Sequence, residues 1–278
     1  MGHYFLRHLR RIALGLQYDG TPWQGWQTQP HRQTVQDSLE QALAKFCQCA
    51  LPTTCAGRTD SGVHALGQVV HFDTEVTREP FSWVRGVNAF LPASIAVRWA
   101  AEVAGGDDGF HARFSALVRT YHYVIYNHPV RSPLWAGRAG WAFRPLDADA
   151  MHASAQALLG EQDFSAFRAA ECQAASPLRT MHSVAVTRHR DTIIVTLRAN
   201  AFLQHMVRNI VGSLIQVGTG NRPQAWIGEL LASRDRELAA PTFSPDGLYL
   251  AKVDYDARWG LPHEDDLART LPFELPFN

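Results

Sequence analysis

The sequence predicts an α+β fold built from two similar halves around a mostly antiparallel sheet. Strand-like and helix-like stretches alternate along the 278 residues, and the same order of elements recurs in the second half. Short turns separate neighbouring strand-like stretches, which favours antiparallel pairing over a doubly wound parallel sheet. A chain of this length holds one or two domains of about 100 to 200 residues. We therefore expect an N-terminal half over residues 1–110 and a C-terminal half over residues 111–278.

The first half is predicted from apolar periodicity and turn signals. Thr34 precedes an amphipathic stretch and is a suitable N-cap, and the pair Gly105 and Gly106 marks a turn after the last strand. The expected elements are, in order, a strand over residues 12–18, a helix over 34–46, a strand over 68–72, a short helix over 81–90 and a strand over 94–103.

The second half is predicted to repeat this theme. Its expected elements are a strand over residues 118–127, a helix near 147–159, strands over 180–188 and 192–199, a helix over 202–217 and a short strand over 248–255. No sequence identity between the two halves accompanies the repeated order, so the duplication is predicted at the level of structure.

Composition excludes several classes of protein. Hydrophobic residues make up 46% of the chain and charged residues 19%, which excludes a disordered chain. No stretch approaches the roughly 20 apolar residues of a membrane span, and the start MGHYFLRHLRR lacks the apolar region of a secretory signal. We expect a cytoplasmic protein without a membrane partner.

The four cysteines are expected to be reduced thiols. Cys47, Cys49, Cys55 and Cys172 form neither two CxxC pairs nor an evenly spaced disulfide framework. A zinc site from the first three would depart from the usual spacing of ligands, so we predict no metal.

The charges are segregated, although 26 basic and 26 acidic residues give a net charge of zero. Residues 110–210 carry eleven arginines against six acidic residues, and 24 of the 26 basic residues are arginine. Arginine offers a planar fork that matches phosphate and stacks on bases. Coding from a GC-rich genome explains the same excess of arginine, so composition alone leaves a nucleic-acid partner open.

The densest chemistry lies in CAGRTDSGVHALGQVVHFD, over residues 55–73. A short polar loop between two strands usually serves a site, and Gly57 and Gly62 can take positive φ. Such a turn would push the carboxylate of Asp60 out from the sheet edge, where Arg58 can hold it ionised by charge and hydrogen bonding. In the alternative reading, Arg58 and Asp60 only pin the turn.

Aromatic side chains mark two other stretches. Trp23 and Trp26, in ALGLQYDGTPWQGWQ, are either base-stacking surfaces or lids on a hydrophobic core. On the strand over 118–127, alternation places Arg119, Tyr121 and Tyr123 on one face.

The helix over 202–217 is expected to have two faces. Its apolar residues gather on one side, and a polar stripe gathers on the other within about 100°. The stripe consists of His205, Arg208, Asn209, Gly212 and Gln216. It points to a cavity or a partner, or else it is a solvated face, although the usual solvating residues Glu and Lys are absent from it.

Five segments together resemble the tRNA pseudouridine synthase A family, which isomerises uridines 38, 39 and 40 of the anticodon stem-loop. They are QYDGTPWQGWQ (17–27), AGRTDSGVHALGQVVHF (56–72), RTYHYVIYN (119–127), FLQHMVRNIVGSLIQVGTG (202–220) and PDGLYLAKVDY (245–255), and their order and spacing cover nearly the whole chain. The second segment is the most specific of the five. The tail after Tyr255, rich in Ala, Asp and Glu, departs from the family pattern.

The resemblance implies roles for four residues. Asp60 is similar to the family's catalytic aspartate, Arg58 to its neighbouring arginine, Tyr121 to its active-site tyrosine and Arg208 to the basic partner of the aspartate. The last three are expected to bind the substrate. The choice of Tyr121 over Tyr123 comes from the motif, because alternation alone does not separate them.

The family also implies a continuous antiparallel sheet with helices on one side and an active-site cleft on the other, a homodimer, tRNA as partner, and no metal or cofactor. The isomerisation breaks the bond from N1 to C1′, rotates the uracil and joins C5 to C1′. One carboxylate suffices, whether it attacks C1′, adds to C6 or removes a ribose proton, and the sequence does not choose among these.

Two functions of other classes compete with this interpretation. A hydrolase would use Ser61 or Asp60 with His64 or His71, but the sequence has neither a GxSxG elbow nor an HExxH helix. An RNA-binding protein without catalysis would use the same aromatic and arginine residues, and would not need Asp60 near Arg208.

Overall fold

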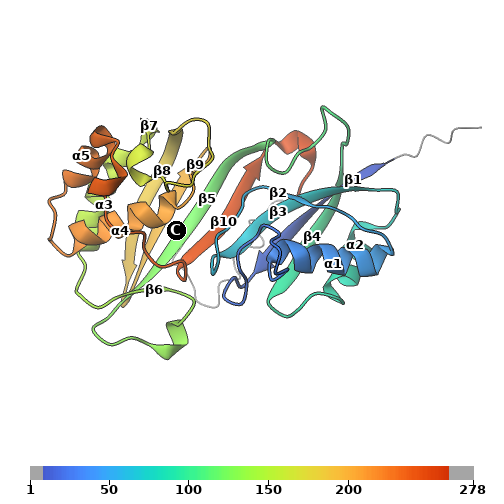
Figure 1. The fold of residues 1–278 in the computed structure, drawn as a ribbon, viewed down its shortest axis with the longest axis horizontal. Helices are drawn as coiled ribbons and strands as arrows, with labels where there is room; N and C mark the ends of the chain where they lie inside the picture. Colours follow the sequence, from blue (N-terminus) through green and yellow to red (C-terminus); the bar gives the residue numbers. More distant parts are fainter. Residues whose placement is uncertain (1–8, 263–278) are drawn as a thin grey trace, which may run out of the picture. The chain divides into compact units, whose positions relative to one another are not determined.

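The computed structural model describes residues 9–262 (Figure 1). The chain divides into two compact units, and we describe each by itself. The described part of the first unit comprises residues 9–117 and 252–262, and the second unit comprises residues 118–251. The division into domains after residue 110 stays a prediction.

The first unit is an antiparallel sheet with two helices. Strand β1 pairs with β3 on one side and β4 on the other, β2 adds to β3, and α2 packs on β4 and against α1. The elements are β1 (Arg10–Tyr18), α1 (Val35–Cys47), β2 (Thr54–Cys55), β3 (His64–Thr74), α2 (Pro80–Asn88) and β4 (Ile95–Val103). Thr34 caps α1 as predicted, because its side chain accepts a hydrogen bond from Asp37 N.

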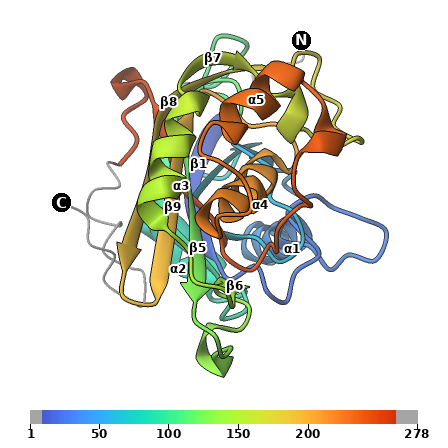
Figure 2. The same cartoon turned by 90° about the vertical axis from the view of Figure 1, so that its left-hand side faces the viewer.

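The second unit repeats the combination of an antiparallel sheet and packed helices. Strands β5, β9, β8 and β7 pair in that order, β6 runs parallel to β5, and α3 packs on β8 and against α4 and α5 (Figure 2). The elements are β5 (Ala116–Asn127), β6 (Gly140–Ala142), α3 (Ala148–Ala155), β7 (Gly160–Asp163), β8 (Leu178–His189), β9 (Thr192–Ala199), α4 (Met206–Gly218) and α5 (Trp226–Ser233).

Strand β10 (Leu248–Tyr255) is shared by the units, because residues 248–251 belong to the second and residues 252–255 to the first. The α+β class with a mostly antiparallel sheet is thus confirmed. Strands β6 and β7 and helix α5 were not predicted, since each is short and lacks a clear period in the sequence.

One core of large side chains fills each unit. Trp26, Trp83 and Phe72 are almost fully buried in the first unit, and Tyr123 and Phe167 in the second. Of the two readings of Trp26, the structure therefore supports the hydrophobic core. None of the helices within residues 9–262 has the length and apolar character needed to cross a bilayer.

Candidate active site

The loop that carries Asp60 joins β2 to β3 in the first unit. Its start is tied to β3 twice. Ala56 N donates to Val69 O at 2.8 Å, and the side-chain amide of Gln68 donates to Gly57 O at 2.6 Å. The side-chain amide of Gln68 thus holds the backbone at Gly57, which makes no regular strand pairing with β3.

Thr59, directly before Asp60, is the buried anchor of this loop. Its hydroxyl shares a hydrogen bond of 2.8 Å with the hydroxyl of Tyr18, and its carbonyl accepts Trp26 N at 2.9 Å. After the aspartate, Val63 N donates to Asp60 O at 3.1 Å and closes the turn. Thr59 is 6% exposed whereas Asp60 is half-buried, so a fixed backbone places Asp60 at the edge of the core.

The segment over residues 19–26 packs tightly against this loop, and glycines make the approach possible. A Cβ at Gly20 would lie 2.0 Å from Val63 O. Gly25 takes a φ of +83°, and a Cβ there would lie 2.9 Å from Thr59 O. Gly62 N and the Ser61 hydroxyl both donate to the carbonyl of Trp23, each at 3.3 Å. The two segments therefore form one interlocked surface.

Two expectations for the loop are only partly met. Gly62 takes the positive φ that the sequence predicts, at +78°, and Gly57 does not. Arg58 is exposed, and within residues 9–262 its side chain makes no hydrogen bond or ion pair. The expected hydrogen bond from Arg58 to Asp60 is therefore not formed in this structure, and the guanidinium is open to an external anion.

The side chains that a hydrolase would use have structural roles instead. The Ser61 hydroxyl donates to backbone and amide oxygens, and not to an imidazole. His64 Nδ1 accepts Gly20 N at 3.0 Å, and His71 Nδ1 accepts Ala112 N at 3.2 Å. Burial lowers the pKa of His71 to about 4, which keeps the neutral imidazole that this bond needs. The geometry gives no support to a Ser–His pair.

In the second unit, the two tyrosines that alternation leaves equivalent have different environments. Tyr123 is fully buried, its hydroxyl donates to Ser244 O at 2.7 Å, and burial raises its pKa. The ring of Tyr121 is 9% exposed and meets Phe202 edge to face, with 4.9 Å between ring centroids. Tyr123 is thus a core residue, and Tyr121 is the better candidate to meet a ligand.

The helix that carries Arg208 is shorter than predicted. Helix α4 begins at Met206, and Phe202 and Leu203 precede it. His205 takes a left-handed φ of +61° at the N-cap, which interrupts the helical backbone. The prediction that His205 lies on the polar face of the helix is therefore wrong.

The polar stripe of α4 contacts the segment over residues 236–243 of the same unit. Asn209 is fully buried, and its side-chain oxygen accepts Arg236 Nη2 at 3.1 Å and the Thr242 hydroxyl at 2.7 Å. Arg208 Nε donates to Phe243 O at 2.8 Å. The polar stripe is thus not a solvated face. The hydrogen bond from Arg208 Nε orients the guanidinium of that residue.

The cysteines are free thiols. Burial raises the pKa of Cys47 to about 11 and that of Cys55 to about 12, so neither thiol is an activated nucleophile near neutral pH. Within residues 9–262, no three His, Cys, Asp or Glu side chains are grouped as a metal site requires.

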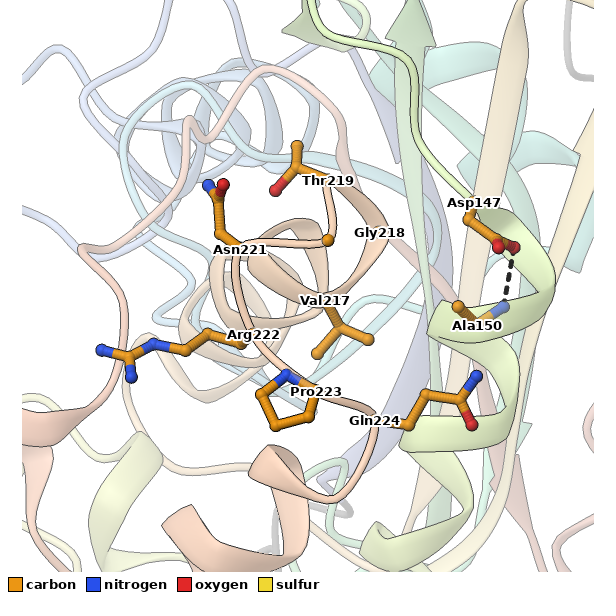
Figure 3. A pocket seen from close by; sticks show the side chains of 10 residues that line it. Asp147, Ala150, Val217, Gly218, Thr219, Asn221, Arg222, Pro223 and Gln224 are labelled. Atoms are coloured by element: carbon orange, nitrogen blue, oxygen red, sulfur yellow. Dashed lines mark hydrogen bonds between the residues drawn. The ribbon is translucent and has the colours of Figure 1, made fainter.

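A surface hollow of about 700 Å³ lies in the second unit, between the end of α4 and the start of α3 (Figure 3). Asp147 at its edge is committed to its own helix, because Asp147 Oδ1 accepts Ala150 N at 2.9 Å. The other lining residues are Val217, Gly218, Thr219, Gly220, Asn221, Arg222, Pro223 and Gln224. None of the four predicted site residues lines this hollow, so its volume does not mark the site.

Comparison with known proteins decides the family. The chain is 63% identical over 257 residues to a tRNA pseudouridine synthase A of Herminiimonas arsenicoxydans, covering 92% of this chain and 94% of that protein. It is 59% identical over 266 residues to the tRNA pseudouridine synthase A of Bordetella petrii, covering 95% and 98%. A sequence model described as tRNA pseudouridine synthase matches residues 16–115 and 154–256. The chain belongs to the tRNA pseudouridine synthase family.

This membership makes the chain an isomerase that converts uridine to pseudouridine in tRNA. The family model matches two ranges, one in the first unit and one almost wholly in the second. Asp60 and Arg58 lie in the first match and Arg208 in the second, whereas Tyr121 lies between them.

Proposed function

We propose that the chain isomerises uridines 38, 39 and 40 of the tRNA anticodon stem-loop, with Asp60 as the catalytic residue and a flipped-out uridine as the substrate. The observation that carries this proposal is the placement of Asp60, whose half-buried carboxylate follows the buried anchor Thr59 within the first segment matched by the family model.

The reaction needs a group of this kind. The bond from N1 to C1′ breaks, the uracil turns, and C5 joins C1′. C5 then loses its proton while N1 gains one, so no electrons are exchanged with a partner. An ionised carboxylate can attack C1′, add to C6 or remove a ribose proton. A fixed backbone supports each route, because it holds the carboxylate in place before the substrate arrives.

A uridine inside a stem is out of reach of a side chain, so the nucleotide has to leave the stack at a cost of a few kcal/mol. We propose that Tyr121 stacks on the extruded uracil and that its hydroxyl assists removal of the C5 proton. Arg58, exposed and without a bond within the described residues, binds a phosphate next to the extruded nucleotide.

Arg208 is proposed to favour the ionised form of Asp60 while tRNA is bound. Its Nε donates a hydrogen bond to Phe243 O. Because the guanidinium is planar, this bond also restricts where its two terminal nitrogens can point. Turnover of Arg208→Ala as a function of pH tests this role: we expect lower turnover, and activity that stays unchanged from about pH 5 to 8 would contradict the pairing.

Tritium release from C5-labelled uridine in unmodified tRNA tests the function, followed by mapping of pseudouridine in the product. We expect release from positions 38, 39 and 40 with the native chain, and none with Asp60→Ala, while tRNA binding changes little. An RNA-binding protein without catalysis would release no tritium at all. If Asp60→Ala lost binding and activity in step, the carboxylate would have a recognition role instead.

We further propose that the enzyme works in the cytoplasm as a homodimer and without metal or cofactor. Sedimentation velocity of the purified chain measures the oligomeric state. Full activity after treatment with EDTA is expected, and a loss of activity restored by a divalent cation would contradict the absence of a metal.

A further inference from the structure

The turn over residues 111–115 of the first unit is fixed by several hydrogen bonds of its own. Ser115 N donates to His111 O at 2.8 Å, and His111 N donates back to the Ser115 hydroxyl at 3.0 Å. The ring Nδ1 of His111 accepts the backbone N–H groups of Arg113 and Phe114, each at 3.2 Å. The turn therefore has one defined conformation before any ligand binds.

The same turn is anchored to the core of its unit through Ala112. Ala112 N donates to the ring of His71, and Ala112 O accepts the hydroxyl of Tyr255 at 2.6 Å. The ring of His111 lies 4.8 Å from that of His71. Burial lowers the pKa of both imidazoles, which keeps them neutral and able to accept these bonds.

From this rigid base, Phe114 projects into solvent. Its side chain is 76% exposed, although it stacks on His111 with ring centroids 4.2 Å apart and an interplanar angle of 26°. The guanidinium of Arg113 lies 5.7 Å from the same ring. An exposed aromatic ring that is already held in place loses little conformational entropy when a second ring stacks on it.

The turn itself offers a positive charge to a polyanion. Residues 110–117 contain no acidic side chain and Arg113 is exposed, while the exposed Asp107 and Asp108 lie before the turn. His71, whose ring accepts the bond from Ala112 N, lies opposite Thr54 of β2 in the sheet register. The turn is therefore held next to the short strand after which the Asp60 loop begins.

We propose that Arg113 and Phe114 bind the tRNA strand next to the reacting nucleotide, Phe114 by stacking on an unpaired base and Arg113 by contact with a phosphate. This inference rests on the proposed role of Asp60, because it places the two residues on the same unit as the Asp60 loop. They are positioning residues and do not touch the reacting atoms.

The test compares Phe114→Ala and Arg113→Ala with matched controls on the same unit. Phe81, 67% exposed on α2, and the exposed Arg85 give Phe81→Ala and Arg85→Ala. Binding of unmodified tRNA and steady-state turnover are measured for each variant, and thermal unfolding verifies that each is folded. Phe114→Tyr, which keeps a stacking ring, serves as the conservative variant.

We expect Phe114→Ala to weaken tRNA binding and raise KM by about 10-fold, with kcat at saturating tRNA unchanged and with recovery in Phe114→Tyr. Arg113→Ala should reduce the slope of log affinity against log salt by about one. Neither control variant should change binding. Binding of Phe114→Ala equal to that of Phe81→Ala would overturn the proposal, and so would a change in oligomeric state, which would assign the turn to a protein interface.

The outcome is separable from that of the proposed function. Repeating the binding measurements in the Asp60→Ala background isolates the contact with RNA from catalysis. Activity in Asp60→Ala would refute the catalytic role of that residue and leave the binding effect of Phe114 intact. Unchanged binding in Phe114→Ala would refute this inference and leave Asp60 unaffected.

Discussion

The hydroxyl of Tyr18, at the end of β1, lies 2.8 Å from the hydroxyl of Thr59, the residue before Asp60. The side-chain amide of Gln68 on β3 reaches the same tyrosine oxygen at 3.4 Å. The Asp60 loop is thus joined to two neighbouring strands by side chains and not only by its own backbone. Changes to these buried partners should alter turnover without touching the substrate.

Tyr18→Phe removes the hydroxyl that holds Thr59. We expect a stability loss of about 1 kcal/mol and a several-fold lower kcat, because the backbone that carries Asp60 becomes less well defined. Tyr249→Phe is the matched control, since Tyr249 donates to Arg138 O at 2.7 Å in the second unit. Equal values of kcat for the two variants, measured with saturating tRNA, would contradict a positioning role for Tyr18.

Gly25→Ala should impair catalysis more than it impairs folding. Gly25 has a φ of +83° and a Cβ there would press on Thr59 O at 2.9 Å, so the Asp60 loop has to shift. Gly106→Ala meets the same backbone strain at φ +86°, with nothing within 4 Å of the added carbon. We expect a stability loss of about 1 to 2 kcal/mol in Gly106→Ala, a somewhat larger loss in Gly25→Ala, and a large fall in kcat in Gly25→Ala alone. Denaturant unfolding and turnover assays measure the two effects.

Asn209→Ala should destabilise the second unit by about 2 kcal/mol, because the buried Phe167 carbonyl loses its donor and Arg236 and Thr242 each lose a bond to the amide oxygen. Asn221→Ala is the control, since Asn221 is exposed and its amide bonds only to Gln216 among the contacts described for it. Urea unfolding of the two variants measures the difference, and equal losses would show that the buried network contributes nothing.

The free energy of unfolding should decrease in mild acid, in part because His122 becomes protonated on unfolding. Burial lowers the pKa of His122 in the folded chain to about 4, against about 6.5 when the chain is unfolded. Between these values the unfolded chain binds the proton more readily, so the free energy of unfolding is greatest above pH 6.5 and is lost as the pH falls through 4. The full effect is on the order of 3 kcal/mol.

His122→Gln, which cannot take up a proton, should make that dependence less steep and leave the share that His71 contributes, while it retains a polar partner for Thr196, 2.9 Å from His122 Nδ1. Urea unfolding from pH 7.5 down to pH 4.5 gives the two curves. Parallel curves for the native chain and the variant would exclude His122 as a source of acid lability.

Periodicity and turn chemistry predict most of the fold. The strand over residues 248–255 has the predicted bounds, and the cap at Thr34 is correct, because each depends on local signals. The start of α4 is wrong by four residues, since the apolar pattern continues through Phe202 and Leu203 while the backbone turns at His205. A left-handed histidine has no clear sequence signal, because most residues avoid that conformation.

The candidate site is predicted less completely. The motif finds Asp60, but the partners that hold its loop, Tyr18 and Gln68, lie on other strands and pair with it only through the fold. The role of the polar stripe on α4 depends on a segment more than twenty residues further along the chain. The turn over residues 111–115 carries no recognisable motif, and only the exposure of Phe114 draws attention to it.

The interlocking of residues 19–26 with the Asp60 loop limits how such an active site can be engineered. An eight-residue insert copied into a foreign hairpin would bring the aspartate but neither the glycines that make room for its turn nor the hydroxyl that secures it. A transplant would have to include three separate stretches of polypeptide in register, so the smallest portable version of this loop is the whole β1–β3 half-sheet with its helix.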